Sequence, residues 1–172
     1  MRALPQRQLD RRITRVWRLS ALINVLIWFG LLVAGTAVAG RTLRALDTQP
    51  ARVLGTGFFI LALALAGLAV VLLVALVGVT PKIRWLQWRF DVLEEEIDLH
   101  HGIFWRRRVI IPLVRVQNVE TRQGPILRAN GLASLTVATA GGQHEIPGLA
   151  VAEADALRDH VAVLARLAPD DV

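Results

Sequence analysis

Two long stretches without a charged residue constrain this chain more than any other feature. Residues 19–40 and 53–80 hold 22 and 28 consecutive uncharged, mostly apolar residues. As helices they would be roughly 33 Å and 42 Å long, whereas the hydrocarbon core of a bilayer is about 30 Å thick. A small soluble domain cannot bury helices of this kind. We therefore expect a transmembrane hairpin, with the 12-residue linker 41–52 between its two helices.

The first stretch also has features of a cleaved signal peptide. An arginine-rich segment precedes it, and Ala37-Val38-Ala39 resembles a cleavage site. The apolar core of a signal peptide, however, is usually about 7–15 residues long. Because this stretch is longer and a second one follows closely, we expect it to stay in the protein as a helix.

The charge of the chain is divided unevenly between its halves. Residues 1–90 carry 12 basic and 2 acidic residues, whereas residues 91–172 carry 8 and 12. The net charge of +6 therefore belongs to the half with the apolar stretches, which argues against a nucleic-acid partner. The flank before the first stretch is the more basic one, so the positive-inside rule places both termini in the cytoplasm. The arginines of that flank are Arg2, Arg7, Arg11, Arg12, Arg15 and Arg18, against Asp10. The linker is basic too, with Arg41, Arg44 and Arg52 against Asp47.

Aromatic and basic residues border the two stretches at what would be one membrane interface. The expected interface anchors are Trp17, Arg18, Lys82, Arg84, Trp85 and Trp88. No ionisable side chain lies inside either stretch, which disfavours an ion pump or transporter. Asn24 is the one strongly polar side chain of the first stretch, and it could bond to another helix. Small residues four apart, such as Gly30 and Ala34, favour close helix packing or merely reflect composition.

The pattern changes to short strands and one helix in residues 85–168. Residues 96–101 alternate between polar and apolar, which predicts a strand with Ile97 and Leu99 facing a core. Further strands are expected at 109–111 and around 134–139, with a hairpin turn at Gly141-Gly142 and a return strand that ends at Pro147-Gly148. The last segment has helical periodicity. Its apolar stripe consists of Leu157, Val161, Leu164 and Ala168.

Several runs in this region resemble a known family. They are Gly102-Ile103-Phe104-x-Arg106, then Val109-Ile110-Ile111-Pro112-Leu113-x-Arg115-Val116-Gln117-Asn118-Val119, then Gln123-Gly124-Pro125, Gly131-Leu132-Ala133 and Thr139-Ala140-Gly141-Gly142. Together they are similar to the YdbS-like bacterial pleckstrin-homology (PH) domain, also described as a membrane-flanked domain. Ala129-Asn130 depart from the bulky apolar residues common in that family. The resemblance implies a PH-like β-barrel with a C-terminal helix, and a complex with a related membrane protein.

The expected fold is therefore a membrane protein with a two-helix transmembrane hairpin, followed by a mainly-β, PH-like barrel capped by a C-terminal α-helix. Its parts are a basic cytoplasmic N-terminus (1–18), the hairpin (19–80, with helices 19–40 and 53–80) and a cytoplasmic PH-like domain (85–168). The expected location is the inner (plasma) membrane of a bacterial cell, crossed by both helices.

One cluster is a candidate contact site. The residues expected to touch lipid or a partner are Phe104, Trp105, Arg106, Arg107, Arg108 and Arg115. Arginines beside exposed aromatic rings suit an anionic membrane surface. The alternative is a solvated strand whose arginines pair with the glutamates of residues 94–96. For Arg115 and its neighbours Gln117 and Asn118, the alternative is local capping of a turn.

No pattern indicates catalysis or metal binding. The chain has no cysteine, and it has none of the serine, zinc or phosphate-loop motifs that would indicate an enzyme. Adjacent His100 and His101 would point to opposite faces of a strand, so they cannot share one metal ion. We therefore expect no catalytic residue, no metal and no cofactor. The function we expect is that of a membrane-anchored scaffold, a subunit of a membrane complex with a related partner or a second copy. The alternative is a module that binds anionic lipid headgroups.

Overall fold

The computed structural model describes residues 5–46 and 48–167 and divides the chain into two compact units. The helical hairpin comprises residues 17–80, and the β domain comprises the residues up to Val16 and those from Pro81 onward. The sequence predictions at Arg2, Asp47 and Ala168 fall outside the described residues.

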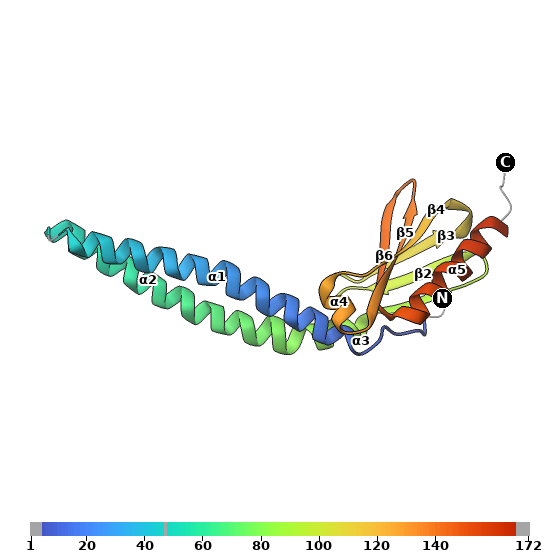
Figure 1. Cartoon of the computed structure of the whole chain (residues 1–172), viewed down its shortest axis with the longest axis horizontal. Coiled ribbons are helices and arrows are strands. Elements are labelled where there is room, and N and C mark those ends of the chain that lie inside the picture. The colour runs from blue at the N-terminus through green and yellow to red at the C-terminus, as the bar shows by residue number, and fades with distance from the viewer. Residues whose placement is uncertain (1–4, 47, 168–172) are drawn as a thin grey trace. The chain divides into compact units, whose positions relative to one another are not determined.

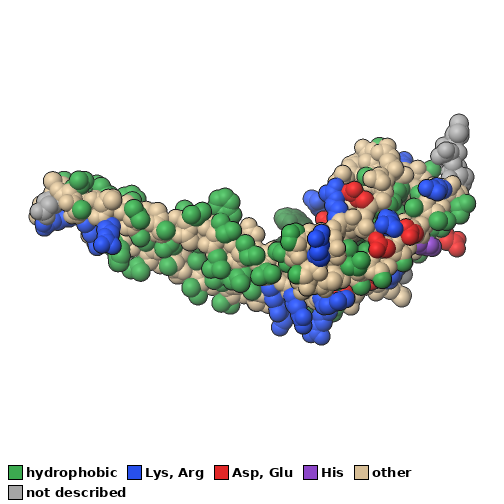
Figure 2. Space-filling model, in the orientation of Figure 1, with side chains coloured by type: hydrophobic (Ala, Val, Ile, Leu, Met, Phe, Trp, Pro, Cys, Tyr) green, Lys and Arg blue, Asp and Glu red, His purple; other side chains and the backbone are tan. Residues whose placement is uncertain are grey.

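The helical hairpin consists of α1 (Ile13–Ala45) and α2 (Gln49–Leu73), and α2 continues through a π-helical segment, η1 (Val74–Val79), into α3 (Thr80–Gln87). By length and composition alone, Ile13–Ala45 and Gln49–Gln87 can each cross a membrane. Both helices run past the ends of the uncharged stretches. Figure 2 shows the hairpin covered with hydrophobic side chains, with Lys and Arg side chains gathered near its ends. Such a surface suits a hydrocarbon environment.

The two long helices approach each other closely at a pair of glycines. A Cβ atom on Gly40 would lie 2.9 Å from the Gly55 carbonyl oxygen, and one on Gly55 would lie 2.7 Å from the Gly40 carbonyl oxygen. Only the absence of both side chains permits this approach. These two glycines lie outside the four-residue spacings noted above, and a Cβ atom on Gly30, which belongs to those spacings, would have no neighbour within 4 Å.

The β domain contains two antiparallel three-stranded sheets (Figure 1). The first has the order β1-β2-β3, formed by β1 (Arg89–Val92), β2 (Glu96–His101) and β3 (Arg107–Pro112). A 3-10 turn, η2 (Leu113–Arg115), leads to the second sheet, β4-β5-β6, with β4 (Val116–Arg122), β5 (Leu132–Thr139) and β6 (Gly142–Ala150). A short helix, α4 (Pro125–Ala129), joins β4 to β5. No strand pairing links the two sheets within the described ranges, so the expected closed barrel is wrong.

The core of the β domain lies between the sheets and α5 (Val151–Leu167), the C-terminal helix. Ile97 and Leu99 of β2 are buried, as their alternation predicts, and Leu157 and Val161 of α5 are buried along the predicted stripe. Both faces of the central strand β5 are covered, because Ser134 and Thr136 are buried as well as Leu135 and Val137. Alternation along β5 therefore does not mark a solvent face.

Two other details differ from the sequence prediction. Strand β6 does not end at Pro147-Gly148, since these residues form an irregularity inside it and the pairing with β5 resumes at Leu149. Proline is tolerated there because β6 is an edge strand. Gly148 has a φ of +65°, and a Cβ atom on it would lie 2.5 Å from the Ile13 side chain. Strand β1 was not predicted, since four residues are too few for a periodic signal.

The largest difference concerns the segment before the first span, which was expected to be a separate basic N-terminus. Residues 5–16, here called the N-terminal segment, pack into the β domain. The Arg7 carbonyl oxygen accepts a 3.0 Å hydrogen bond from the Phe90 N–H, and the Asp10 N–H donates to the Gly148 carbonyl oxygen. Leu9, Ile13 and Val16 are buried. The PH-like domain therefore includes residues from both sides of the hairpin.

Candidate functional site

The most exposed aromatic side chains of the β domain lie in the loop between β2 and β3. Phe104 is 91% exposed and Trp105 is 85% exposed. The loop turns sharply at Gly102, which has a φ of +123° and lies so close to the Trp105 carbonyl oxygen that no Cβ atom would fit. We call Phe104, Trp105, Arg106 and Arg107 the aromatic tip. Large apolar rings held in water are the feature of this domain that most needs a binding partner.

The aromatic tip lies at the end of the β domain where the chain enters from the helices. Strand β2 ends at His101, whose ring stacks on Trp88 with a centroid distance of 5.2 Å, and Trp88 directly follows α3. Pro81, the first residue of the β domain after the hairpin, lies seven residues before Trp88, about 10 Å along a helix. The aromatic tip and the point where the chain enters from the hairpin therefore lie at the same end of the β domain.

The three consecutive arginines of residues 106–108 differ in their surroundings, because only Arg108 contacts a buried acidic residue among those described. Arg108 forms an ion pair with Asp98, in which its Nη2 lies 2.6 Å from Asp98 Oδ2 and its Nε lies 3.1 Å from both carboxylate oxygens. The hydrogen bond to Asp98 raises the pKa of Arg108, and Asp98 itself is 4% exposed. Arg108 is therefore a structural residue. The predicted pairing partners were the glutamates of residues 94–96, and of these Glu96 also raises the pKa of Arg108 electrostatically.

Arg106 and Arg107 are exposed and form no ion pair with any other residue that the structure describes. Positive charge near this end also acts on His101. Burial lowers the pKa of His101, and Arg107, Arg84, His100 and His144 lower it further. The His101 ring at the base of the tip is therefore neutral at pH 7, and the charge of the tip comes from its two arginines.

Arg115 lies apart from the aromatic tip. It is exposed in η2 and lines a groove of about 470 Å³ with apolar walls that include Ile110, Pro112 and Val114. Gln117 and His144 add polar groups to the same groove. Arg115 thus belongs to a second surface, and the local capping expected of Gln117 and Asn118 is not seen among the described hydrogen bonds.

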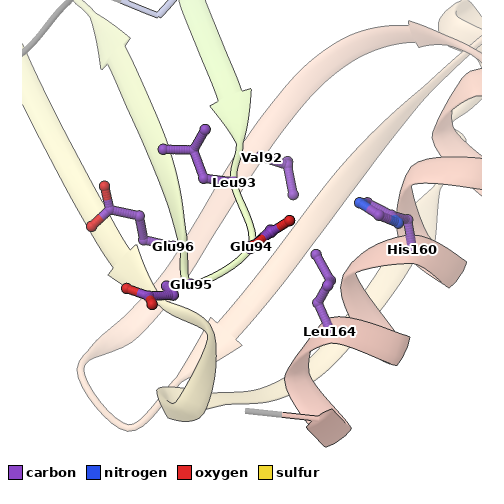
Figure 3. Close-up of a pocket in the computed structure, with 7 residues that line it drawn as sticks. All are labelled: Val92, Leu93, Glu94, Glu95, Glu96, His160 and Leu164. Carbon is purple, nitrogen blue, oxygen red and sulfur yellow. The ribbon is translucent and has the colours of Figure 1, made fainter.

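The three glutamates of residues 94–96 border a cleft of about 660 Å³ with His160 and Leu164 of α5 (Figure 3). Glu94 points toward the helix, whereas Glu95 and Glu96 point to the other side. The carboxylates therefore do not converge. Within the described ranges, no three His, Cys, Asp or Glu side chains lie close enough to hold a metal ion.

The expected interface anchors have different surroundings. Trp88 is 5% exposed and stacks on His101, so it is a core residue of the β domain and does not fit the role of an anchor. The Trp85 indole N–H donates a 2.8 Å hydrogen bond to the Leu9 carbonyl oxygen, which ties α3 to the N-terminal segment. Lys82 and Arg84 are exposed on α3. Trp17 and Arg18 are half-buried near the start of α1.

Comparison with known proteins adds to this geometry. The profile of a family described as the bacterial PH domain matches residues 51–165, which include most of α2 and the part of the β domain that follows the hairpin up to residue 165. This chain belongs to the bacterial PH domain family. It is 50% identical over 96 residues to the UPF0699 transmembrane protein YdbS of Bacillus subtilis (strain 168). The match covers 56% of this chain and about 60% of the length of that relative. No solved structure matches significantly.

Sequence reasoning missed two contributions to this end of the domain. Asp98 occupies a polar position of an alternating strand, and nothing in the pattern distinguishes it from a solvated residue. The N-terminal segment did carry a signal, because Leu9, Ile13 and Val16 are spaced by four and three within an arginine-rich run. That spacing is typical of a helix start packed against a core.

Proposed function

We propose that this chain is a non-catalytic interaction protein, anchored in the bacterial inner membrane by the helical hairpin, that acts as a scaffold or subunit of a membrane complex. The exposed aromatic tip carries the proposal. Aromatic and arginine side chains are the types that dominate binding energy at protein interfaces. Phe104 and Trp105 offer two large rings with two arginines beside them.

The topology we propose places both termini in the cytoplasm. The N-terminal segment packs into the same domain as residues 81–167, so the two flanks of the hairpin are held on one side of any membrane that it crosses. This argument does not depend on flanking charge. The charge bias then favours the cytoplasmic side, since the N-terminal flank is the more basic.

Photocrosslinking in native membranes tests the scaffold. A photoreactive phenylalanine derivative replaces Trp105 in the full chain, and the same residue replaces Val163, an exposed residue on α5, as the matched control. We expect a discrete protein adduct from position 105 and none from position 163. Equal labelling at both positions, or no protein adduct at position 105, would contradict the proposal.

A second candidate function is docking on anionic lipid headgroups. It is favoured by Arg106 and Arg107, which have no acidic partner in the described part of the chain and lie near the entry of the chain from the helices. Each arginine near an anionic surface contributes about 1 kcal/mol. A lipid adduct alone from position 105 would move the assignment to this function.

The lipid candidate has its own test. The full chain carries a polarity-sensitive dye on a cysteine at position 104, which is unique because the natural sequence has no cysteine. In nanodiscs we expect a blue shift on addition of phosphatidylglycerol. The double change of Arg106 and Arg107 to Gln should weaken docking by about 30-fold, whereas Arg166→Gln on α5 should not. An emission spectrum that is the same with and without phosphatidylglycerol would exclude headgroup binding.

A further inference from the structure

An exposed seam runs along α1 on the side that faces away from α2. Its residues are Asn24, Ile27, Leu31, Ala34 and Val38, spaced by three and four. Ile27, Leu31 and Val38 are 52%, 65% and 62% exposed. This spacing is the a/d repeat with which parallel helices pack together. The seam therefore has the pattern of a helix–helix interface without a helix packed on it.

The hairpin itself does not use this seam. Val25 and Gly40 are buried and Gly40 lies against Gly55 of α2, so these two residues mark the inner face of α1. At about 100° per residue, the seam centres on the opposite side of the helix. The seam is thus open to whatever surrounds the hairpin in the membrane.

The polar side chain of Asn24 makes it unfavourable for the seam to face lipid alone. It is the sixth residue of the first uncharged stretch, about 8 Å inside it along the helix axis. Its side-chain Nδ2 donates a 2.8 Å hydrogen bond to the Ser20 carbonyl oxygen. The second N–H and the Oδ1 acceptor have no partner among the described residues. Polar groups without partners in hydrocarbon are costly, and asparagine is a common bridge between membrane helices.

We propose that the seam packs against α1 of a second copy of this chain, forming a parallel dimer in which the two Asn24 side chains hydrogen-bond reciprocally. Two copies inserted with the same topology present identical helices related by a twofold axis along the membrane normal. Asn24 then meets Asn24 at the same depth, and an amide supplies both the donor and the acceptor that this symmetry demands. An asparagine at an a position also fixes the register of such a pair. The proposal rests on α1 spanning the bilayer and not on what the aromatic tip binds.

Cysteine scanning in the full chain tests the position of the interface. Single cysteines replace Ile27, Leu31 or Val38 on the seam, and Leu26 or Leu32 as exposed controls off the seam. Oxidation in native membranes should give disulfide-linked dimers from the seam positions and at least fivefold less from the controls. Equal yields at all five positions would overturn the proposed face. A disulfide to a different protein would overturn the proposed dimer and identify that protein as the partner at the seam.

The role of Asn24 is tested by energy transfer between labelled full chains diluted in liposomes. Asn24→Leu should weaken association by about fivefold to tenfold, the effect of two modest interhelical hydrogen bonds. Asn24→Gln should recover part of the loss. The control is Thr36→Val, because the Thr36 hydroxyl bonds to carbonyl oxygens of its own helix, Leu32 and Val33.

Two results of this second experiment would overturn the proposal. One is unchanged association of Asn24→Leu, and the other is a monomer at every lipid dilution. Protease protection of the hairpin, measured in the same liposomes, separates a failure of the dimer from a failure of membrane insertion. A protected but monomeric hairpin would leave the anchoring function intact and refute the dimer.

Discussion

At the scale of single residues, the β domain distinguishes side chains that look alike in the sequence. Arg106 and Arg108 belong to one run of three arginines, yet only Arg108 reaches the buried carboxylate of Asp98. Removing one partner of a buried ion pair leaves the other charge uncompensated, which is costly. An exposed arginine without a partner has little effect on stability when it is replaced.

We expect Arg108→Gln to lower the free energy of unfolding measurably, because the buried Asp98 side chain would lose its ion-pair partner. Arg106→Gln is the matched control and should change it by less than about 0.5 kcal/mol. Chemical denaturation of the full chain in detergent measures both. Equal effects of the two substitutions would show that the pair with Asp98 does not stabilise the domain.

His101 predicts a dependence of stability on pH. Its folded pKa lies below the ordinary value of 6.5, mainly because it is buried, so the unfolded chain binds the proton more tightly. The contribution of His101 to the free energy of unfolding is therefore fully present above about pH 6.5. It is lost as the pH falls through the lowered pKa of the folded state. The decline should stay below about 1 kcal/mol, because solvent screens the partly exposed ring.

Denaturation of the wild type and of His101→Phe at pH 7.5 and pH 5.5 measures this contribution. The variant keeps an aromatic ring against Trp88 and should lose part of the pH dependence. The lowered pKa of Asp10, caused first by its hydrogen bond to Arg12, acts below its ordinary value of 3.8 and does not enter this range. An identical pH dependence in both proteins would refute the assignment to His101.

At the scale of elements, periodicity predicted most of the secondary structure. The 2-residue alternation located β2, and the 3-and-4 spacing located α5, because each of these elements has one core-facing side. It could not show that the strands form two open sheets, since closure depends on pairing between distant strands. Of the site, the exposed tip was predicted from the sequence, whereas Asp98 and Trp88 acquire their roles only through partners in the folded domain.

The glycine crossing gives a prediction for the helical hairpin. Gly55→Val should separate α1 from α2 and cost about 1–3 kcal/mol, because its side chain would meet the backbone of Gly40. Gly57→Val is the matched control, two residues away, where a Cβ atom has no neighbour within 4 Å. Energy transfer between one dye on each helix, followed during denaturation in SDS, measures the difference. Similar curves for the two variants would contradict the close approach.

At the scale of the whole molecule, the β domain is built from two parts of the chain that the hairpin separates. The N-terminal segment supplies buried apolar residues, and the Arg7 guanidinium forms a 2.7 Å ion pair with Glu153 of α5. Residues 81–167 therefore lack part of their core when they are taken alone. The domain boundary at residue 85 that strand patterns indicate leaves this contribution out.

We expect Ile13→Ala to destabilise the β domain by about 2–4 kcal/mol, although Ile13 precedes the first span, because its side chain is 1% exposed. Arg15→Ala, at an exposed position, is the control. Thermal unfolding of the full chain measures both. In a fragment that begins at Pro81, a synthetic peptide of residues 5–16 should raise Tm. A fragment that is as stable without the peptide would refute the shared core.

The shared core also ties the completion of folding to the history of membrane insertion. Ile13 leaves the ribosome about 135 residues before Gly148, the backbone it packs against. At typical synthesis rates of about 5–20 residues per second, this delay is roughly 7–27 s. In the topology proposed above, only a chain whose two helices have both crossed the bilayer returns the second part to the compartment that holds the first. A chain inserted once, or inverted at one span, would then expose an incomplete domain to cellular proteases, and under that proposal the shared core would act as a check on correct insertion.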